Sequence, residues 1–286
     1  MKLIIISGLS GSGKTVALHT LEDEGFYCVD NLPLGLLPAL TEQLTSQQLQ
    51  VYDNIAVGID ARSGAKDLRR FNQIVQAVKC DSLDIEVVYF QAELNELIKR
   101  FSDTRRRHPL TRKGMPLTEA IDIERNLLSP IAHEADLCLD TTNTNVHQLR
   151  AIVKERVISR PKQELSILIQ SFGFKHSVPT DSDFVFDVRC LPNPHWEPEL
   201  RPLTGQDKEV QAFLKEQEDV IDMFNHICKM LEHWVPKFAE QSRYYLTVSV
   251  GCTGGQHRSV YIAERLNEYF RDKFSSVSLR HREMQK

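Results

Sequence analysis

The sequence predicts an α/β protein of two domains: a larger domain on a parallel sheet, then a smaller α/β domain with a glycine-rich loop. Three observations lead to this fold class. Apolar segments of strand length alternate with polar, helix-compatible segments, as in parallel sheets that helices cover on both faces. An apolar run near the N-terminus leads directly into a first glycine-rich loop. A polar stretch around Pro161 divides the chain, so we expect domains at residues 1–158 and 164–286.

The first glycine-rich loop matches the pattern G-x-x-x-x-G-K-[ST] in full, with Gly8, Leu9, Ser10, Gly11, Ser12, Gly13, Lys14 and Thr15. A strand-like run at 3–7 precedes it, and a helix-like stretch follows from Val16. The glycines let backbone N–H groups turn inward, and the helix N-terminus adds partial positive charge. In this setting Lys14 reaches the β- and γ-phosphates and the Thr15 hydroxyl binds Mg²⁺. The pattern therefore predicts a P-loop NTPase-like domain that binds a nucleoside triphosphate, ATP or GTP.

The remainder of the first domain continues the alternation of strands and helices. We expect strands at 26–30, 55–60, 85–90 and 135–139, and helices at 68–78, 93–101 and 117–132. Ligands of open parallel sheets bind at the carboxyl ends of the strands. Asp30 and Asp60 fall at two such ends, so we expect both carboxylates beside the phosphate loop.

The second domain begins with strands expected at 165–170 and 184–188, followed by two helices. The second helix, at about 220–238, places apolar residues at spacings of three and four: Ile221, Phe224, Ile227, Leu231, Trp234 and Phe238. That stripe predicts a core-facing side, with Trp234 packed inside. A strand at 244–250 and a helix at 260–270 complete the domain.

A second glycine-rich loop, residues 251–259, joins the last expected strand to the last expected helix. This arrangement favours anion binding. The guanidinium of Arg258 suits phosphate oxygens, and Thr253 and His257 can donate hydrogen bonds. His195 lies in a proline-rich loop that can reach the same mouth, although a purely structural role fits this histidine equally well.

Cys252 and Arg258 also have the spacing of a cysteine-phosphatase loop, in which a thiolate attacks phosphorus and the arginine binds the other oxygens. Gly251 stands where such enzymes usually place a histidine, and no general-acid aspartate is evident in a distinct loop. Phosphatase chemistry is therefore a lesser alternative to anion binding.

Two basic clusters have open interpretations. Arg105, Arg106, Arg107 and His108, with Arg112 and Lys113, fit a lid over bound nucleotide or a solvated charged loop. Near the C-terminus lie Lys273, Arg280, His281, Arg282 and Lys286. This basic end fits contacts with an RNA backbone or a solvated tail, and the net charge of −4 adds no general attraction to nucleic acid.

Composition favours a soluble globular protein, with 41% hydrophobic and 26% charged residues in a chain of 286. We expect no signal peptide, and no apolar run approaches the roughly 20 residues of a membrane span. Six cysteines without a C-x-x-C pair argue against a zinc site and for reduced thiols. These features favour a cytoplasmic protein.

The chain resembles the bacterial RapZ family over essentially its whole length. The resemblance is carried by five segments: residues 8–15, 25–33, 104–110, 191–196 and 251–259. It implies a cytosolic homo-oligomer, specifically a trimer, that binds ATP and GTP and hydrolyses them slowly. Enterobacterial members are RNA-binding adaptors that deliver a small regulatory RNA to an endoribonuclease and so tune glucosamine-6-phosphate synthesis.

The resemblance also assigns residues. It makes Asp60, Ala61, Arg62 and Ser63 a second nucleotide-binding segment. It places a phosphosugar site at His195, Thr253, Gly254, His257 and Arg258, which agrees with the anion-binding interpretation of the second loop.

The sequence departs from the family pattern at three places. Gln91 follows Phe90 where an aspartate is usual, which leaves Asp30 or Asp60 for Mg²⁺ and predicts slow hydrolysis. The basic C-terminus is shorter than in enterobacterial members, and Gln256 replaces a usual lysine, which weakens the case for tight RNA binding. The sequence thus predicts a nucleotide-binding regulator, with a P-loop small-molecule kinase as the main alternative.

Overall fold

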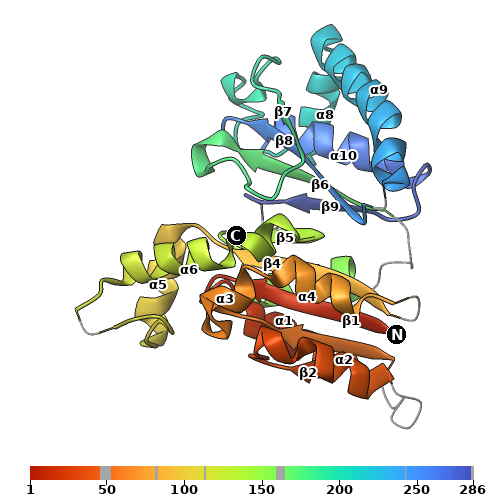
Figure 1. Cartoon of the computed structure of the whole chain (residues 1–286). Helices are drawn as coiled ribbons and strands as arrows, with labels where there is room; N and C mark the ends of the chain where they lie inside the picture. The colour runs from red at the N-terminus through yellow and green to blue at the C-terminus, as the bar shows by residue number, and fades with distance from the viewer. Residues whose placement is uncertain (46–52, 81–82, 113, 159–164, 242, 285–286) are drawn as a thin grey trace. The chain divides into compact units, whose positions relative to one another are not determined.

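A computed structural model describes residues 1–45, 53–80, 83–112, 114–158, 165–241 and 243–284. The chain divides into two compact units, Met1–Ser159 and Arg160–Lys286 (Figure 1). Each unit contains a parallel sheet, helices and a hydrophobic core of its own.

The first unit is built on a parallel sheet with the strand order β2-β3-β1-β4-β5. Its strands are β1 (Lys2–Gly8), β2 (Tyr27–Val29), β3 (Asn54–Gly58), β4 (Asp84–Gln91) and β5 (Leu137–Asp140). The central strand β1 pairs with β3 on one side and β4 on the other, with Ile5 opposite Val57 and Val87. Both faces of β1 are covered, and its residues Leu3–Gly8 are buried, which explains its unbroken apolar run.

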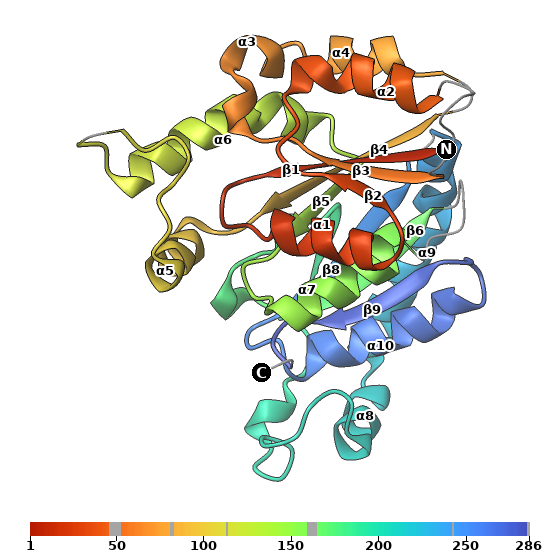
Figure 2. The same cartoon turned by 90° about the horizontal axis from the view of Figure 1, so that it is seen from below.

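Helices cover both faces of this sheet. The helices are α1 (Lys14–Asp23), α2 (Leu37–Thr45), α3 (Ala65–Leu68), α4 (Phe71–Val78), α5 (Leu94–Thr104), α6 (Leu117–His133) and α7 (Val146–Val153). Short turns are η1 (Leu34–Leu36), η2 (Ala61–Ser63) and the π-helical η3 (Lys154–Ile158). Figure 2 shows α1 and α7 on one side of the sheet and α2, α3 and α4 on the other. Phe71 of α4 and Leu128 of α6 share a buried cluster with Ile5.

The second unit has a parallel sheet with the order β7-β8-β6-β9. Its strands are β6 (Ser166–Gly173), β7 (Phe184–Asp187), β8 (Tyr245–Cys252) and β9 (Val277–His281). Its helices are α8 (Lys208–Lys215), α9 (Glu218–Glu240) and α10 (Arg258–Arg271), with the turns η4 (Phe174–His176) and η5 (Pro194–Trp196). One core joins α8, α9 and α10 to the apolar residues of β6 and β8. The two parallel sheets confirm the α/β fold class.

Several elements differ from the sequence prediction. The helix expected at 68–78 is two helices, because the chain turns at Arg69 and Arg70 between α3 and α4. The strand β9 and the helices α2 and α7 lie where the apolar pattern had indicated no element.

The buried side of α9 is rotated from the predicted stripe. Phe224, Ile227 and Leu231 are buried as expected, but Ile221 is 40% and Trp234 is 45% exposed. Val220 and Val235, one position away from them, are fully buried instead. Successive residues of a helix are rotated by about 100° about its axis. Ile221 and Trp234 therefore lie at the edge of the core, whereas Val220 and Val235 face into it. The prediction that Trp234 packs inside was therefore wrong.

We expect Gly8→Ala to destabilise the first unit by roughly 3 kcal/mol or more. Gly8 has φ 137°, and a Cβ there would lie 2.0 Å from the carbonyl oxygen of Phe90. Urea unfolding followed by circular dichroism measures the loss. The matched control is Gly25→Ala, which has φ 86° but open space around its Cβ, so it carries only the backbone cost of about 1–2 kcal/mol. Equal losses in the two variants would contradict the role of the Phe90 contact.

Candidate functional site

The phosphate loop connects the carboxyl end of β1 to the first residue of α1. Gly13 precedes the helix with φ 104°, and a Cβ at this position would lie 2.4 Å from the Leu149 side chain. The Lys14 ammonium donates hydrogen bonds to the carbonyl oxygens of Gly8 at 2.6 Å and Leu9 at 3.0 Å. The lysine is thus folded over the loop, at the end of the central strand.

Loss of water around Lys14 lowers the pKa of its ammonium, while the carboxylates of Glu124, Asp60 and Asp30 oppose that shift. An anion bound at the loop would restore the favourable environment for the positive charge. The ammonium is therefore poised for an anionic ligand.

A cavity of about 680 Å³ opens over the loop, within the size range of small-molecule sites. Of the sequence-predicted residues, it is lined by Ser10, Gly11, Gly13, Lys14, Thr15, Asp60 and Arg62. Gly8, Leu9, Ser12, Ala61 and Ser63 stand outside this lining. The buried side chain of Leu9 packs in a small apolar cluster, and the Ser63 hydroxyl accepts a hydrogen bond from the Leu34 N–H at 3.3 Å.

Asp30 and Asp60 both line this cavity, as their strand-end positions predict. Asp60 Oδ1 accepts from the Arg62 N–H at 2.9 Å, and Oδ2 accepts from Arg62 Nε at 2.7 Å. The same guanidinium contacts the side-chain oxygen of Asn31. Asp60 is therefore engaged in positioning Arg62.

Arg100 and Thr141 hold the outer side of the phosphate loop, and the sequence motifs indicated neither. Arg100 donates to the Gly11 carbonyl oxygen at 3.1 Å and to the Thr141 carbonyl oxygen at 2.6 Å. The Thr141 hydroxyl donates to the Ser12 carbonyl oxygen at 2.9 Å. The loop is thus tied to α5 and to the end of β5 by side chains that are distant in sequence.

Glu124 of α6 holds the phosphate loop in place through hydrogen bonds. The Ser10 N–H donates to its Oε2 at 2.8 Å, and the Ser10 hydroxyl donates to its Oε1 at 2.6 Å. His108 Nε2 contacts Oε2 at 3.0 Å, while His108 Nδ1 accepts from the Leu110 N–H at 3.2 Å. Because Nδ1 is the acceptor, the imidazole proton lies on Nε2 and points to Glu124.

The environment of Glu124 keeps it ionised. Burial by itself would raise its pKa, but the hydrogen bond from His108, the charge of Lys14 and the two bonds from Ser10 outweigh burial and lower it. His108, expected in a lid or a solvated loop, is 3% exposed. The first basic cluster is therefore anchored at its end, while Arg106 and Arg107 line the cavity; Lys113 lies outside the described residues.

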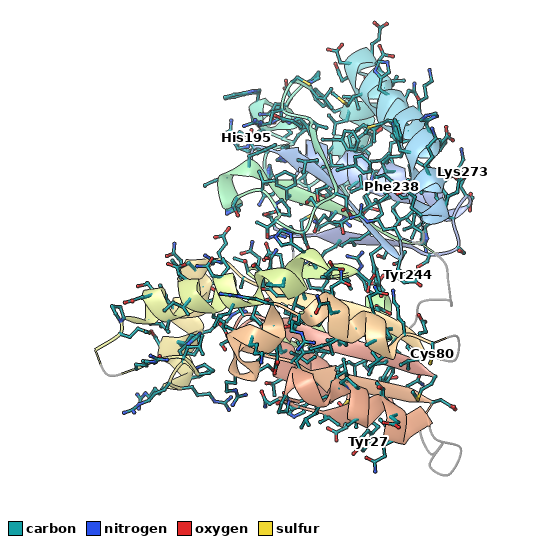
Figure 3. The ribbon with its side chains drawn as sticks, viewed as in Figure 1. Tyr27, Cys80, His195, Phe238, Tyr244 and Lys273 are labelled. Carbon is teal, nitrogen blue, oxygen red and sulfur yellow. The ribbon has the colours of Figure 1, made fainter. Side chains whose placement is uncertain are left out.

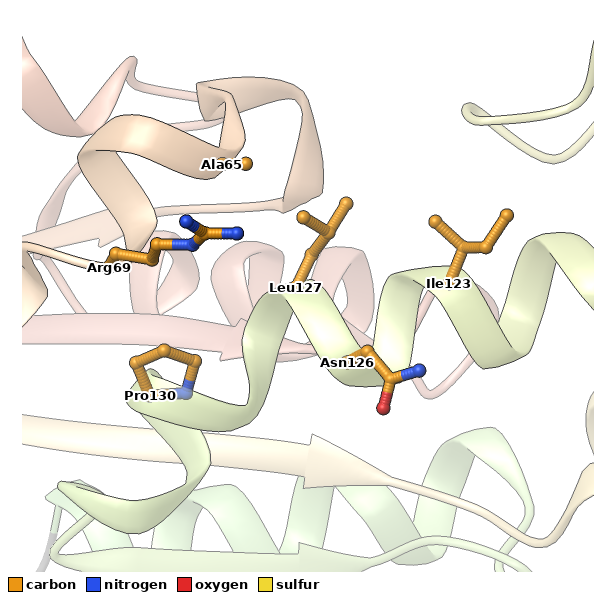
Figure 4. A pocket seen from close by; sticks show the side chains of 6 residues that line it. All are labelled: Ala65, Arg69, Ile123, Asn126, Leu127 and Pro130. Atoms are coloured by element: carbon orange, nitrogen blue, oxygen red, sulfur yellow. The ribbon is translucent and has the colours of Figure 1, made fainter.

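Two further cavities belong to the first unit. One of about 700 Å³ adjoins the first and shares Phe101, Arg106 and Arg107 with it. The other, of about 240 Å³, lies between α3 and α6 and is lined by Ala65, Arg69, Ile123, Asn126, Leu127 and Pro130 (Figure 4).

The second glycine-rich loop joins β8 to α10 and closes around the thiol of Cys252. The Gly255 N–H donates to Cys252 Sγ at 3.2 Å, and Ser259 Oγ lies 3.1 Å from the same sulfur. Cys252 is 3% exposed. The thiol is therefore buried inside the loop and packs against its backbone.

Arg258 is the first residue of α10, His257 directly precedes it, and both are buried, whereas Thr253 and His195 are exposed at the surface. The Arg258 guanidinium donates to the carbonyl oxygens of Arg189 at 2.8 Å and Leu191 at 2.9 Å, and reaches the Thr253 hydroxyl at 3.4 Å. The His195 and His257 rings lie 6.3 Å apart. The structure thus brings the predicted residues of this site together, with His195 at the edge of the unit (Figure 3).

Burial lowers the pKa of His257, and the nearby His195 and Arg258 lower it further, although its hydrogen bonds to the Leu200 and Leu203 backbone oppose them. The neutral form of His257 is therefore favoured, with Nε2 donating to the Leu200 carbonyl oxygen at 3.2 Å.

Glu283 is a buried carboxyl beside this loop that sequence reasoning missed. A Cβ on Gly255 would lie 2.6 Å from Glu283 Oε2, and this oxygen has no hydrogen-bond partner among the described residues. Burial raises the pKa of Glu283, although a hydrogen bond from the Gly173 backbone and the charges of Arg282 and Arg280 oppose it. Its signal in the sequence, one acidic residue within a basic end, was too weak to single it out.

The second basic cluster does not form an exposed tail. Arg280, His281 and Arg282 are 7%, 8% and 6% exposed, at the end of β9 and directly after it. His281 Nδ1 lies 2.8 Å from Ser171 Oγ, and its Nε2 lies 3.1 Å from Glu264 Oε1. The interpretation of these residues as a solvated tail was therefore wrong, because β9 pairs with β6 and encloses them.

The remaining members of this cluster are separate. Lys273 is ion-paired with Glu232 of α9 and lies on the opposite side of the second unit from His195 (Figure 3). Lys286 lies outside the described residues.

The central strand, the loop that follows it and the lysine at the start of α1 define a P-loop α/β protein with a second glycine-rich loop in a separate unit. The chain belongs to the RapZ family. The model of the RapZ-like N-terminal domain matches residues 1–160, and the model of the RapZ C-terminal domain matches residues 165–285. The resemblance expected from the motifs is confirmed.

Full-length relatives agree with this assignment. A nucleotide-binding protein of Thioalkalivibrio sulfidiphilus is 55% identical over 285 residues, 99% of this chain and 100% of the relative. A nucleotide-binding protein of Hahella chejuensis is 52% identical over 284 residues, 99% of each chain. Among solved structures, a shikimate kinase from Acinetobacter baumannii is 17% identical, with a TM-score of 0.37, and covers 55% of this chain and 93% of its own.

Among the residues that the structure describes, none of the helices combines the length and the apolar composition that crossing a membrane requires.

We expect Glu283→Gln to stabilise the second unit at neutral pH relative to the wild type. Because the folded-state pKa of Glu283 is raised, its contribution to stability is present below the unfolded pKa and is lost as the pH rises through the folded value. The glutamine variant lacks this loss. Thermal melts from pH 4 upward, followed by the fluorescence of Trp196 and Trp234, measure it, with the exposed Glu209→Gln as the matched control. Parallel pH dependences of wild type and Glu283→Gln would contradict the buried carboxyl.

Proposed function

We propose that this protein is a nucleotide-binding regulator whose first unit binds a nucleoside triphosphate, ATP or GTP. The observation that carries the proposal is the Lys14 ammonium held over a glycine-rich loop, at the mouth of a cavity of about 680 Å³. Backbone N–H groups, the start of α1 and Lys14 together suit the β- and γ-phosphates. The names of the full-length relatives agree with this proposal.

Mg²⁺ accompanies the nucleotide in this proposal. The exposed Thr15 and the Asp30 carboxylate line the cavity and supply the hard oxygen ligands that Mg²⁺ prefers. Asp60 fits this task less well because both its oxygens accept hydrogen bonds from Arg62. Thr15 and Asp30 therefore hold the ion in our proposal.

Slow hydrolysis follows from the residues near the phosphates. Position 91, at the end of β4, is a glutamine and brings no negative charge to a metal-bound water. Glu124 is committed to Ser10 and His108. The site is thus better suited to bind a nucleotide and signal its presence than to hydrolyse it rapidly.

The second unit senses a phosphosugar in this proposal, specifically glucosamine-6-phosphate, at His195, Thr253, Gly254, His257 and Arg258. The clustering of these residues around the loop before α10 supports the assignment. An anionic group at the helix start would gain from the backbone N–H groups and from Arg258.

In the enterobacterial members of the family, the resemblance implies that the output of the regulator is carried by RNA. We propose that this protein, as a cytoplasmic homo-oligomer, specifically a trimer, binds a small regulatory RNA and presents it to an endoribonuclease. The structure describes four residues of the second basic cluster, and of these four Lys273 is exposed. The burial of Arg280, His281 and Arg282 favours a different surface for the RNA backbone.

Two other chemistries have structural support of their own. A small-molecule kinase is favoured by the second cavity beside the nucleotide cavity. A cysteine phosphatase is favoured by the hydrogen bond from Gly255 to the Cys252 sulfur, but Cys252 is only 3% exposed, which restricts the access of a phosphate ester to the thiol.

Lys14→Ala is expected to weaken ATP and GTP binding by about 10- to 100-fold, because a hydrogen bond to a charged group contributes roughly 1.5–3 kcal/mol. Calorimetric titration of both nucleotides with Mg²⁺ measures the effect. Lys66→Ala, an exposed lysine of α3, is the control for loss of one positive charge. Unchanged affinity in Lys14→Ala would refute the phosphate-loop assignment.

Arg258→Ala and Cys252→Ser distinguish a phosphosugar site from a phosphatase. We expect Arg258→Ala to weaken glucosamine-6-phosphate binding by at least about tenfold, and Cys252→Ser to leave it within a few fold. Calorimetry with the phosphosugar, and release of phosphate from an aryl phosphate, are the two measurements. Hydrolysis of the aryl phosphate that disappears in Cys252→Ser would overturn the sensing role in favour of the phosphatase.

A further inference from the structure

A second cavity of the first unit adjoins the proposed nucleotide cavity. It is about 700 Å³ in volume, within the range of small-molecule sites. The residues around it come from the end of α5, the segment that follows α5 and the beginning of α6: Phe101, Ser102, Arg106, Arg107, His108, Thr111, Arg112, Met115 and Leu117.

The charge that lines this cavity is positive and comes from arginines. Arg106, Arg107 and Arg112 line it, and among the residues that the structure describes no aspartate or glutamate belongs to its lining. Within the described part of the chain, no ion pair or hydrogen bond engages these three guanidinium groups, whereas Arg62, Arg100 and Arg189 each pair with a carboxylate. Unpaired arginines around one hollow favour an anion, and their planar donors match phosphate oxygens best.

The rest of the lining suits a small organic molecule that carries the phosphate. The hydroxyls of Ser102 and Thr111 can hydrogen-bond a polar body, and Phe101, Met115 and Leu117 offer apolar contacts. A concave site that combines a few polar groups with apolar walls is typical of small-molecule recognition. An extended polynucleotide would place only part of its length in a cavity of about 700 Å³, so a small molecule fits this site better.

The second cavity is connected to the phosphate loop in two ways. Arg106 and Arg107 line both cavities, so their charges face both ligands. His108 lines the second cavity and contacts Glu124 at 3.0 Å, and Glu124 accepts the hydrogen bond of the Ser10 N–H in the loop. A ligand in the second cavity therefore touches groups that also position the loop.

We propose that this second cavity binds a small phosphate-bearing molecule at the same time as a nucleotide occupies the phosphate loop. In this arrangement Arg112 contacts the second ligand and not the nucleotide. This inference rests on the proposed nucleotide site and adds a second ligand to it. Arg112 lines the second cavity and stands outside the first, so its removal separates the two sites.

The test titrates inorganic phosphate into the full-length protein after the loop has been saturated with Mg²⁺ and a non-hydrolysable ATP analogue. Calorimetry on wild type and Arg112→Gln isolates the part of phosphate binding that depends on Arg112. We expect Arg112→Gln to weaken that part at least tenfold, to leave the affinity for the analogue within twofold, and Arg112→Lys to recover much of the loss. Arg69→Gln, the same change at the third cavity (Figure 4), should leave both affinities unchanged.

The outcomes separate this inference from the proposed function. Analogue binding without any phosphate binding that depends on Arg112 would overturn the second site and leave the nucleotide site intact. If the analogue fails to bind, the proposed function fails, and a phosphate titration of the free protein still decides on Arg112. Binding of an RNA hexamer that requires Arg112, without phosphate binding, would overturn the small-molecule site in favour of a polynucleotide. Arg112 is exposed, and circular dichroism checks that its variants fold.

Discussion

The close approach of the backbone at Gly8 to the end of β4 determines the geometry of the first unit's site. The Leu9 N–H donates to the Phe90 carbonyl oxygen at 3.0 Å, so the chain leaves β1 in contact with its neighbouring strand. A side chain at position 8 would occupy the place of that oxygen. The direction of the loop, the start of α1 and the place of Lys14 all follow from this contact.

A buried carboxylate completes the support of the same loop. Glu124 is fully buried, yet every partner it has carries a hydrogen or a positive charge toward it: Ser10 twice, His108 and, at longer range, Lys14. Removal of one partner would leave a buried charge incompletely satisfied, which costs more than the bond contributes. The network thus makes the loop, α6 and the arginine-rich segment dependent on one another.

Local patterns in the sequence were sufficient for part of this structure. The phosphate loop and the strand-end aspartates Asp30 and Asp60 follow from glycine spacing and from the rule that parallel strands end at one edge. The clustering of Thr253, His257 and Arg258 follows from their proximity in sequence. These features depend on residues within one loop or at equivalent ends of neighbouring strands.

Other features depend on contacts between residues far apart in the chain. His108 looked like part of a charged loop, but its partner Glu124 lies sixteen residues away on the helix α6. Arg280 and Arg282 fitted an RNA contact or a solvated tail from the sequence, and the pairing of β9 with β6 buries them instead. Hydrophobic periodicity indicates which face of a single helix or strand is buried. It does not predict contacts between residues that are far apart in the chain.

The position of β9 at the edge of its sheet has a practical consequence. Its residues 277–281 pair with 167–171 of β6, and Phe270 of the preceding helix belongs to the core. Deletion of the last ten residues would therefore strip a strand from the sheet and expose the backbone of β6, an open edge of the kind that promotes aggregation. A truncated protein that loses partner binding would report damage to the fold, so a partner surface in this region has to be mapped with single substitutions.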